Sequence, residues 1–211
     1  REVELTQLTR QPGGTEVTLS HADGHKETLK PPVILGADGP SSTVRKSLHI
    51  PFSGSSFDEP WKLYDIELDT PLARDEAHIF LLEAGGMFIV RLDNRLWRVI
   101  SNVPNLLEHL PKDTTYGAVG WESDFGISSL LVDRFQKGNV YLAGDAAHIH
   151  SGLGARGMNL GVEDAFVFAN LAAAGNLEAY HRLRHPVDKA VVHQTEHMTE
   201  IPRGKKPFAK V

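Results

Sequence analysis

The residues with the clearest chemical meaning lie in one stretch, GDAAHIHSGLGARGMNLGVEDA, at positions 144–165. Asp145 follows an apolar run at 140–143 that predicts a buried strand. A carboxylate at a strand end is placed to accept hydrogen bonds from the hydroxyls of a sugar or ribityl chain. Three glycines follow in a G-x-G-x-x-G spacing: Gly152, Gly154 and Gly157. Without Cβ atoms they let the backbone approach a flat ligand closely.

The same glycine spacing also matches the fingerprint of dinucleotide-binding folds, which places the first glycine directly after a strand. Here the strand ends near Ala143, nine positions before Gly152. An acidic residue about twenty positions on, Glu178, falls after the following helix has stopped. We therefore expect a loop in front of a helix N-terminus, whose unpaired N–H groups favour a ligand that acquires negative charge, such as a reduced flavin.

The composition is that of a globular protein: 211 residues, 41% apolar and 23% charged, with a net charge of −5. The 22 lysines and arginines are scattered, which disfavours nucleic acid and anionic membranes as partners. No apolar run has the ~20 residues that a membrane span needs, and no leader pattern opens the chain, so we expect a cytoplasmic location. The absence of cysteine excludes a redox dithiol and cysteine-ligated zinc.

In the first half of the chain, alternation around two glycine turns predicts an antiparallel meander over residues 1–35. A short strand at 33–35 then leads into a helix capped by Ser41 or Ser42. Residues 60–130 predict a mostly antiparallel sheet, with a short helical insert near 104–110.

In the second half, residues 158–174 have apolar side chains on nearly every side, which predicts a helix buried over most of its surface and ended by Gly175. A last helix carries the apolar residues of 187–201, and Pro186 is expected to start or kink it.

Two motifs resemble those of a known family. VILGADGPSSTVRKSL resembles the "DG" motif, and VYLAGDAAHIHSGLGARGMNLGVEDA resembles the "GD" motif, of the FAD-dependent aromatic hydroxylases, the p-hydroxybenzoate hydroxylase-like flavoprotein monooxygenases. The resemblance implies an α/β to α+β fold: a partial, Rossmann-like FAD-binding domain at 1–52 and 131–211, with a substrate-domain sheet inserted at 53–130. The family's opening βαβ unit has no counterpart here, and the family commonly has proline where this chain has Gly152.

The resemblance also implies site residues. Asp145 would hold FAD hydroxyls, the backbone after it would line the isoalloxazine ring, and the DG turn would lie near the FAD pyrophosphate. The implied cofactor-binding set is Gly144, Asp145, Leu153, Gly154, Gly157, Met158, Asn159, Asp38, Gly39 and Arg45. From the residues alone, Asp38 and Gly39 could also form an ordinary turn, and Arg45 could equally be a solvated helix residue. No residue is assigned to catalysis.

The implied function is that of a monooxygenase fragment that hydroxylates a small aromatic substrate with NAD(P)H and O2, with FAD retained weakly or not at all by this length of chain. The alternative is a truncated, non-catalytic relic that keeps the fold without FAD. Because missing strands would leave an unpaired sheet edge and exposed apolar helix faces, we expect self-association or association with a missing N-terminal half.

Other chemistry is expected to be absent. The H-x-x-E-H pattern at 193–197 matches a zinc-peptidase motif, but we expect a solvated helix face and no metal site. His148 and His150 are expected to bond the backbone. The residues that could line an aromatic pocket are Tyr64, Phe80, Met87, Phe88 and Trp97, with core packing as the default for each. Those that could steer a carboxylated aromatic are Arg91, Arg95 and Arg98.

Overall fold

The computed structural model describes residues 2–83, 85–152 and 156–200. It divides into two compact units: the first joins Arg1–Ser55 to Ser128–Glu196, and the second is built around Ser56–Ile127. The fold is the mixed α/β architecture expected from the sequence, with mostly antiparallel strands. The domain boundaries expected at 52/53 and 130/131 remain predictions.

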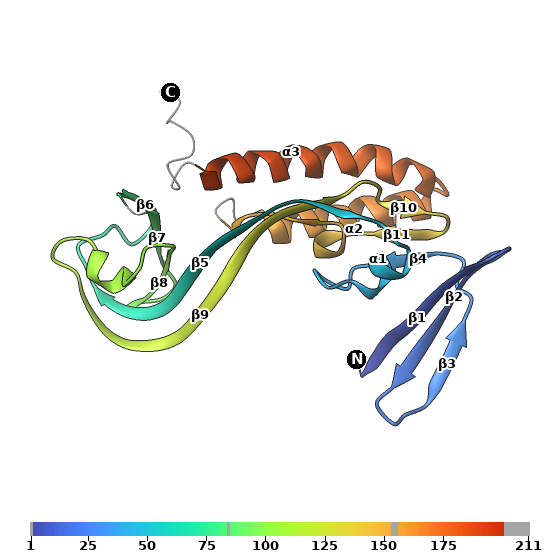
Figure 1. The fold of residues 1–211 in the computed structure, drawn as a ribbon, viewed down its shortest axis with the longest axis horizontal. Helices are drawn as coiled ribbons and strands as arrows, with labels where there is room; N and C mark the ends of the chain where they lie inside the picture. The colour runs from blue at the N-terminus through green and yellow to red at the C-terminus, as the bar shows by residue number, and fades with distance from the viewer. Residues whose placement is uncertain (1, 84, 153–155, 201–211) are drawn as a thin grey trace. The chain divides into compact units, whose positions relative to one another are not determined.

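The first unit opens with the expected meander. Strands β1 (Val3–Gln11), β2 (Gly14–His21) and β3 (Lys26–Leu29) form an antiparallel sheet in the order β1-β2-β3 (Figure 1). Gly13 and Gly24 have φ angles of +95° and +85° in its two turns. Only glycine adopts this region at no steric cost, which is why the sequence could mark both turns.

A second sheet carries the two motifs. It contains β10 (Gln136–Lys137), β11 (Val140–Leu142) and β4 (Ile34–Gly36), and β4 runs parallel to β11 although about a hundred residues separate them. The carboxyl ends of neighbouring parallel strands lie at the same sheet edge. The loops after β4 and β11 therefore start side by side.

Helix α1 (Thr43–Ser47) follows β4, and Ser42 is its N-cap, as expected: the Ser42 hydroxyl accepts a hydrogen bond from the Arg45 N–H. A Cβ at Gly36 would lie 2.7 Å from Cγ1 of Val44. Glycine at the strand end is thus required for α1 to pack this closely on β4.

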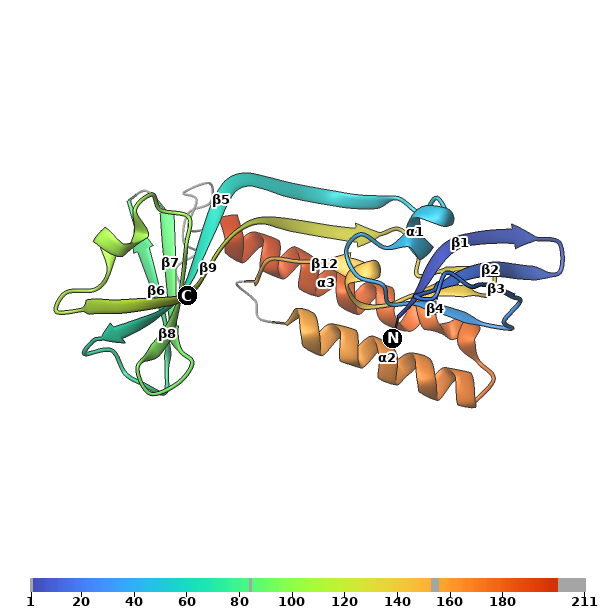
Figure 2. The same ribbon diagram turned by 90° about the horizontal axis from the view of Figure 1, so that it is seen from below.

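Helices α2 (Gly157–Ala173) and α3 (Tyr180–Glu200) lie side by side and run in opposite directions (Figures 1 and 2). The 3-10 turn η4 (Leu177–Ala179) connects them after Gly175, whose φ is +66°. Helix α3 begins six residues before Pro186, so the proline lies inside the helix and does not start it.

The burial expected for α2 is wrong. Met158, Val162 and Phe166 are 81%, 64% and 69% exposed, and they lie four residues apart on one helical face. The opposite side of the helix packs through Leu160 and Asp164, which are almost completely buried. No described segment of the chain covers the apolar face. We name Met158, Val162 and Phe166 the α2 stripe.

The second unit is dominated by antiparallel strands. β6 (Ala77–Leu82), β7 (Gly85–Arg91) and β8 (Leu96–Ser101) are the three strands expected from the sequence. The 3-10 helix η1 (Leu106–His109) matches the expected insert. Its Leu106 joins a buried apolar cluster on one face of the sheet.

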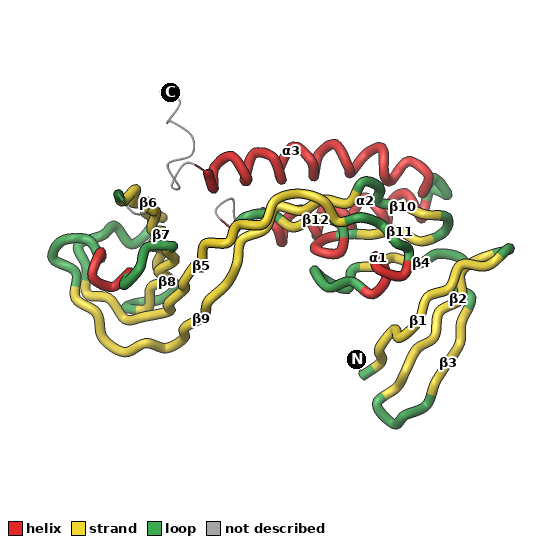
Figure 3. The backbone as a smooth tube through the Cα atoms, viewed as in Figure 1, coloured by secondary structure: helices red, strands yellow, loops and turns green. Residues whose placement is uncertain are grey.

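Two strands are longer than the sequence indicated. β5 (Phe52–Asp69) and β9 (Thr115–Val132) have 18 residues each and belong to both units (Figure 3). The complete sheet has the order β12-β9-β5-β8-β7-β6, with β12 at His148–Ile149. None of the helices in the described part of the chain combines the length and the apolar character needed to cross a bilayer.

Candidate functional site

The turn after β11 places Asp145 as the sequence predicts. Gly144, Asp145 and Ala146 form a single 3-10 turn, η2, and Gly144 has a φ of +57°. A Cβ on Gly161 would lie 3.5 Å from the Gly144 Cα, so the turn packs directly against the backbone of α2. Asp145 is exposed, and no described residue makes a hydrogen bond to its carboxylate. It is therefore free to accept bonds from a ligand.

The N-terminus of α2 is also open. Its N-cap, Arg156, makes no side-chain capping bond, so the N–H groups of the first turn keep their capacity for an acceptor. Gly157 is half-buried, and Met158 and Asn159 are exposed. Leu153 and Gly154, which the resemblance places at the flavin ring, lie outside the described residues.

The path from β11 to α2 does not follow the dinucleotide fingerprint. The strand ends at Leu142 and the helix begins at Gly157, with η2 and β12 between them. A fingerprint glycine turn joins strand and helix directly. The path therefore agrees with the expected loop in front of a helix N-terminus and not with a dinucleotide-binding turn.

In the DG turn, Asp38 is occupied by local bonds. Its Oδ1 accepts from the Ser42 hydroxyl at 2.5 Å, and its Oδ2 accepts from the Val44 N–H at 3.1 Å. Gly39 has a φ of +80° with no atom within 4 Å of a Cβ built there. The carboxylate thus organises the start of α1, and Gly39 allows the turn.

Arg45 is buried, so the solvated alternative is wrong. Its Nη1 donates to the Ala146 carbonyl at 3.0 Å, a residue 101 positions away, and its Nη2 donates to the Pro40 carbonyl at 2.7 Å. The guanidinium lies 4.0 Å from the centre of the Phe52 ring. Arg45 therefore ties the DG turn to the GD turn.

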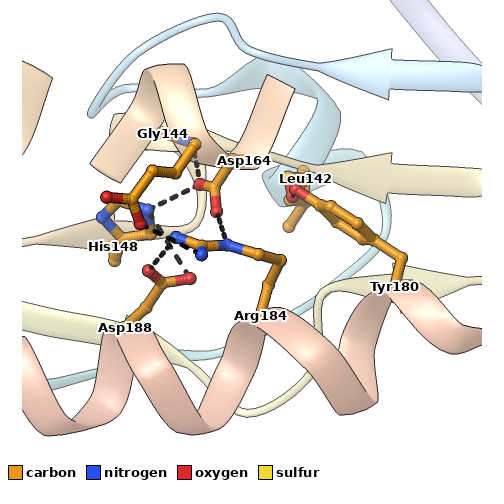
Figure 4. Close-up of polar contacts among 8 residues, drawn as sticks. Leu142, Gly144, His148, Asp164, Tyr180, Arg184 and Asp188 are labelled. Carbon is orange, nitrogen blue, oxygen red and sulfur yellow. Dashed lines mark hydrogen bonds and ion pairs between the residues drawn. The ribbon is translucent and has the colours of Figure 1, made fainter. Parts of the chain in front are cut away.

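Behind the turn lies a buried polar cluster that the sequence analysis missed (Figure 4). Asp164 on α2 accepts hydrogen bonds from the Gly144 N–H at 2.9 Å and from His148 Nε2 at 2.8 Å. Arg184 on α3 donates to Asp164 Oδ1 at 2.6 Å and to Asp188 Oδ1 at 2.8 Å. The available signal was Asp164, a charged residue between the apolar residues Val162 and Phe166 of α2.

The electrostatics of the cluster depend on this bonding. Burial alone would raise the pKa of Asp164. The hydrogen bond and charge of His148, the Gly144 N–H and the hydrogen bond from Arg184 together hold that pKa below its ordinary value. Burial and the nearby charge of Asp164 raise the pKa of Asp188 to about 7. The surroundings therefore favour the ionised form of Asp164 and shift Asp188 toward its protonated form.

The expectation for the two loop histidines is half correct. His150 Nδ1 donates to the Ser151 carbonyl at 2.8 Å, so it bonds the backbone. His148 bonds a carboxylate instead, and its ring stacks on Phe135. Donor atoms of His148, Asp164 and Asp188 lie within 4.8 Å of one another, a spacing that could hold a metal ion. However, Arg184 already pairs with both carboxylates and supplies the positive charge.

In the second unit, most of the candidate pocket residues are core. Met87 and Trp97 are buried in the apolar cluster, and Tyr64 and Phe80 pack against it. Phe88 lies next to Met87 on β7, so its side chain points to the other face of the sheet.

The three candidate arginines differ. Arg98 makes a two-pronged pair with Asp65, with both bonds at 2.8 Å, and lies over the ring of Trp121. Arg95 is exposed and Arg91 is half-buried.

On α3, His193 and His197 are exposed, as expected for a solvated face.

The comparisons with known proteins agree with this geometry. The sequence profile described as "FAD binding domain" matches residues 1–104 and 99–195, which together cover nearly the whole chain. The chain belongs to this FAD-binding family. Its relatives include flavin-dependent and aromatic monooxygenases, as the two motifs implied.

Two curated relatives illustrate the match. Pentachlorophenol 4-monooxygenase of Sphingobium chlorophenolicum is 31% identical over 95% of this chain and 42% of its own length. The uncharacterized aromatic compound monooxygenase YhjG of Bacillus subtilis is 32% identical over 95% of this chain and 45% of its own length. The chain thus spans less than half the length of these relatives.

A solved structure supports the fold. The flavin-dependent monooxygenase PieE, in complex with FAD and substrate, superimposes with a TM-score of 0.77 over 92% of this chain and 39% of that one, at 20% identity. At this identity the similarity concerns the fold alone.

Proposed function

We propose that this chain forms the carboxyl-side FAD-binding segment and the substrate sheet of a monooxygenase that hydroxylates a small aromatic substrate with NAD(P)H and O2. The observation that carries the proposal is the free Asp145 carboxylate, held at the end of β11 within a chain that matches the FAD-binding family. In such an enzyme FAD supplies the redox chemistry, and the protein supplies binding, orientation and exclusion of water.

The residues present fit the cofactor. Asp145 would accept bonds from ribityl hydroxyls, and the uncapped first turn of α2 would face the electron-rich edge of the ring. Gly144, Gly157, Met158 and Asn159 would shape this surface, and Leu153 and Gly154 belong to the same proposed set. Asp38, Gly39 and Arg45 would hold the turn near the pyrophosphate, with Arg45 acting through the Ala146 carbonyl.

The use of NAD(P)H and an aromatic substrate rests on the relatives. Several carry aromatic or phenolic compounds in their names. Steady-state oxidation of NADH or NADPH by the FAD-loaded chain, stimulated by members of a phenol panel, would support the proposal. Oxidation that no phenol stimulates would count against an aromatic substrate.

We also propose that the α2 stripe is a contact surface, covered by a second copy of the chain or by a missing N-terminal half. Three large apolar side chains exposed on one helical face are typical of an interface. Light scattering at high protein concentration should detect association that Val162→Asp weakens. A clean monomer at every concentration would contradict self-association.

The central experiment measures FAD uptake by the purified chain. Asp145→Asn should weaken FAD binding by about tenfold or more, because a hydrogen bond to a charged group is worth roughly 1.5–3 kcal/mol. The matched control is Asp133→Asn, which removes the same charge from an exposed residue whose carboxylate lies 3.7 Å from Nε of its neighbour Arg134.

The control should change the dissociation constant by less than about twofold, since an exposed ion pair contributes little. Equal losses in the two variants would contradict a direct contact from Asp145. A folded chain that never takes up FAD would support the alternative, a non-catalytic relic that keeps the fold.

A further inference from the structure

Two side chains hold the turn that carries Asp145: Arg45 donates to the Ala146 carbonyl, and Asp164 accepts from the Gly144 N–H. The Gly144 N–H points at Asp164, twenty positions later on α2, and donates to its Oδ2 at 2.9 Å. Gly144 also lies against Gly161 of the same helix. The Gly144 N–H is therefore fixed by a carboxylate, whereas the Gly144 carbonyl accepts from the Ala147 N–H at 2.8 Å.

Asp164 is in turn held by two other segments. It is completely buried and accepts from the turn, from His148 of β12 and from Arg184 of α3 (Figure 4). Asp164 Oδ2 accepts from the Gly144 N–H and from His148, and Oδ1 accepts from Arg184. The position of the carboxylate is thus set from three directions.

Arg184 is also constrained on its far side. Its Nη2 donates to Asp188 Oδ1 at 2.8 Å, and its Nη1 donates to Glu163 Oε2 at 3.2 Å. Its side chain is 6% exposed, whereas that of Glu163 is 49% exposed. The guanidinium therefore joins buried carboxylates of both helices and cannot move without breaking several charge-assisted bonds.

Stability alone gives little reason for this arrangement. The desolvation of buried ion pairs offsets much of their attraction, and apolar residues of similar volume often replace them without loss. An apolar residue at position 164 would, however, leave the Gly144 N–H without its acceptor. What the ionic cluster provides beyond apolar packing is a fixed acceptor for the turn.

We propose that Asp164 is a positioning residue for the flavin: with His148 and Arg184 it fixes the Gly144 N–H and so sets the direction of the Asp145 carboxylate. The proposal rests on the proposed function, because it concerns how the ribityl-binding carboxylate is oriented. Asp164 itself touches no ligand in this scheme. Asp164 of α2 and Arg184 of α3 act on the flavin through the turn, whereas the first turn of α2 would face the ring directly.

The test compares wild type with Asp164→Asn and, as the matched control, Glu163→Gln. Glu163 is adjacent on α2 and its carboxylate also contacts Arg184, but it has no bond to the turn. Hydrogen–deuterium exchange followed by NMR measures the exchange rate of the Gly144 amide. Flavin absorbance and fluorescence measure the affinity for FAD and report on the environment of the ring.

Asp164→Asn should speed exchange at Gly144 and weaken FAD binding, each by about tenfold, while Glu163→Gln changes both by less than about twofold. At saturating FAD, ligand binding restores a merely destabilised fold and with it the wild-type flavin spectrum. A positioning role predicts that the absorption band of Asp164→Asn stays shifted at saturation. A spectrum fully restored by FAD would overturn the proposal.

If Asp164→Asn does not fold, Arg184→Lys replaces it, because lysine keeps the charge but loses the Nε bond to Asp164. Faster exchange at Gly144 supports the proposal, and unchanged exchange overturns it. A wild-type chain that binds no FAD defeats the proposed function instead. In that event the exchange of Gly144 still decides whether Asp164 positions the turn.

Discussion

The two units contain aspartate–arginine pairs of the same chemistry in different surroundings. In the first unit, Asp164 and Arg184 are 0% and 6% exposed. In the second unit, Asp65 and Arg98 are 13% and 34% exposed, although their bidentate geometry is at least as regular. The buried pair has one direct hydrogen bond and the more exposed pair has two, so the pair with fewer direct bonds is the one without access to water.

Because their burial differs, the two pairs affect the structure around them differently. The buried pair has no water to replace a lost partner, so every group depends on the others. Arg98 retains access to solvent and also rests on Trp121, so its loss leaves Asp65 with water. The Asp164–Arg184 pair therefore fixes the position of the turn at Gly144, whereas the Asp65–Arg98 pair lies at the surface of the sheet.

The largest effect should follow from Arg184→Met. Methionine fills much of the arginine stem but leaves Asp164 and Asp188 buried without their cation. We expect the free energy of unfolding to fall by about 3–5 kcal/mol. Urea denaturation followed by circular dichroism measures it, and a loss below ~1 kcal/mol would show that water reaches the cluster.

The next effect is a pH dependence that arises from Asp188 in the buried cluster. The pKa of Asp188 is raised to about 7 from an ordinary value of 3.8, so folding favours its protonated form. Its contribution to stability is complete below the ordinary value and is lost as pH rises through about 7.

Asp188→Asn removes this titration, because the amide is neutral at every pH. The stability of the variant relative to wild type should therefore grow from about pH 4 to 7 and level off above the folded pKa. Asp164 shifts in the opposite direction but is present in both proteins. Thermal unfolding at a series of pH values tests this, and a difference independent of pH would refute it.

A neutral bond beside the cluster should matter less. The buried Tyr180 hydroxyl donates to the Leu142 carbonyl at 3.1 Å, at the end of β11. Tyr180→Phe leaves that carbonyl without this donor and should cost about 0.5–1.5 kcal/mol by chemical denaturation. A cost as large as that of Arg184→Met would mean that charge is not what separates the two regions.

The smallest effect is expected from Arg98→Met, the counterpart of Arg184→Met in the second unit. The partly exposed pair with Asp65 should be worth about 0.2–1 kcal/mol in the same denaturation experiment. High salt should reduce the effect further, since exposed charges are screened. A loss of several kcal/mol, unaffected by salt, would remove the contrast between the two pairs.

Much of the fold was predictable because its signals are local. The glycines at 13 and 24 marked the turns of the meander, Ser42 marked the start of α1, and Gly175 lies just past the end of α2. Each signal depends on backbone conformations or caps within a few residues. The strand-end position of Asp145 followed from the same kind of local pattern.

The predictions that were wrong concern neighbours far along the chain. Apolar side chains around α2 suggested burial on all sides, yet the α2 stripe is exposed because no described segment packs there. His148 was expected to bond the backbone, but the fold brings it to Asp164. Periodicity tells which faces of a helix are apolar, not whether a partner exists to cover them.

The kind of chain is readable from the sequence: two motifs in order, a β-rich segment between them and a carboxylate after a strand. The bonds from Arg45 to Ala146 and from Gly144 to Asp164 span 101 and 20 residues and became visible only in the folded structure. The physical reason is that conformational preferences act between near neighbours, whereas a buried charge takes the partners that the topology brings within bonding distance.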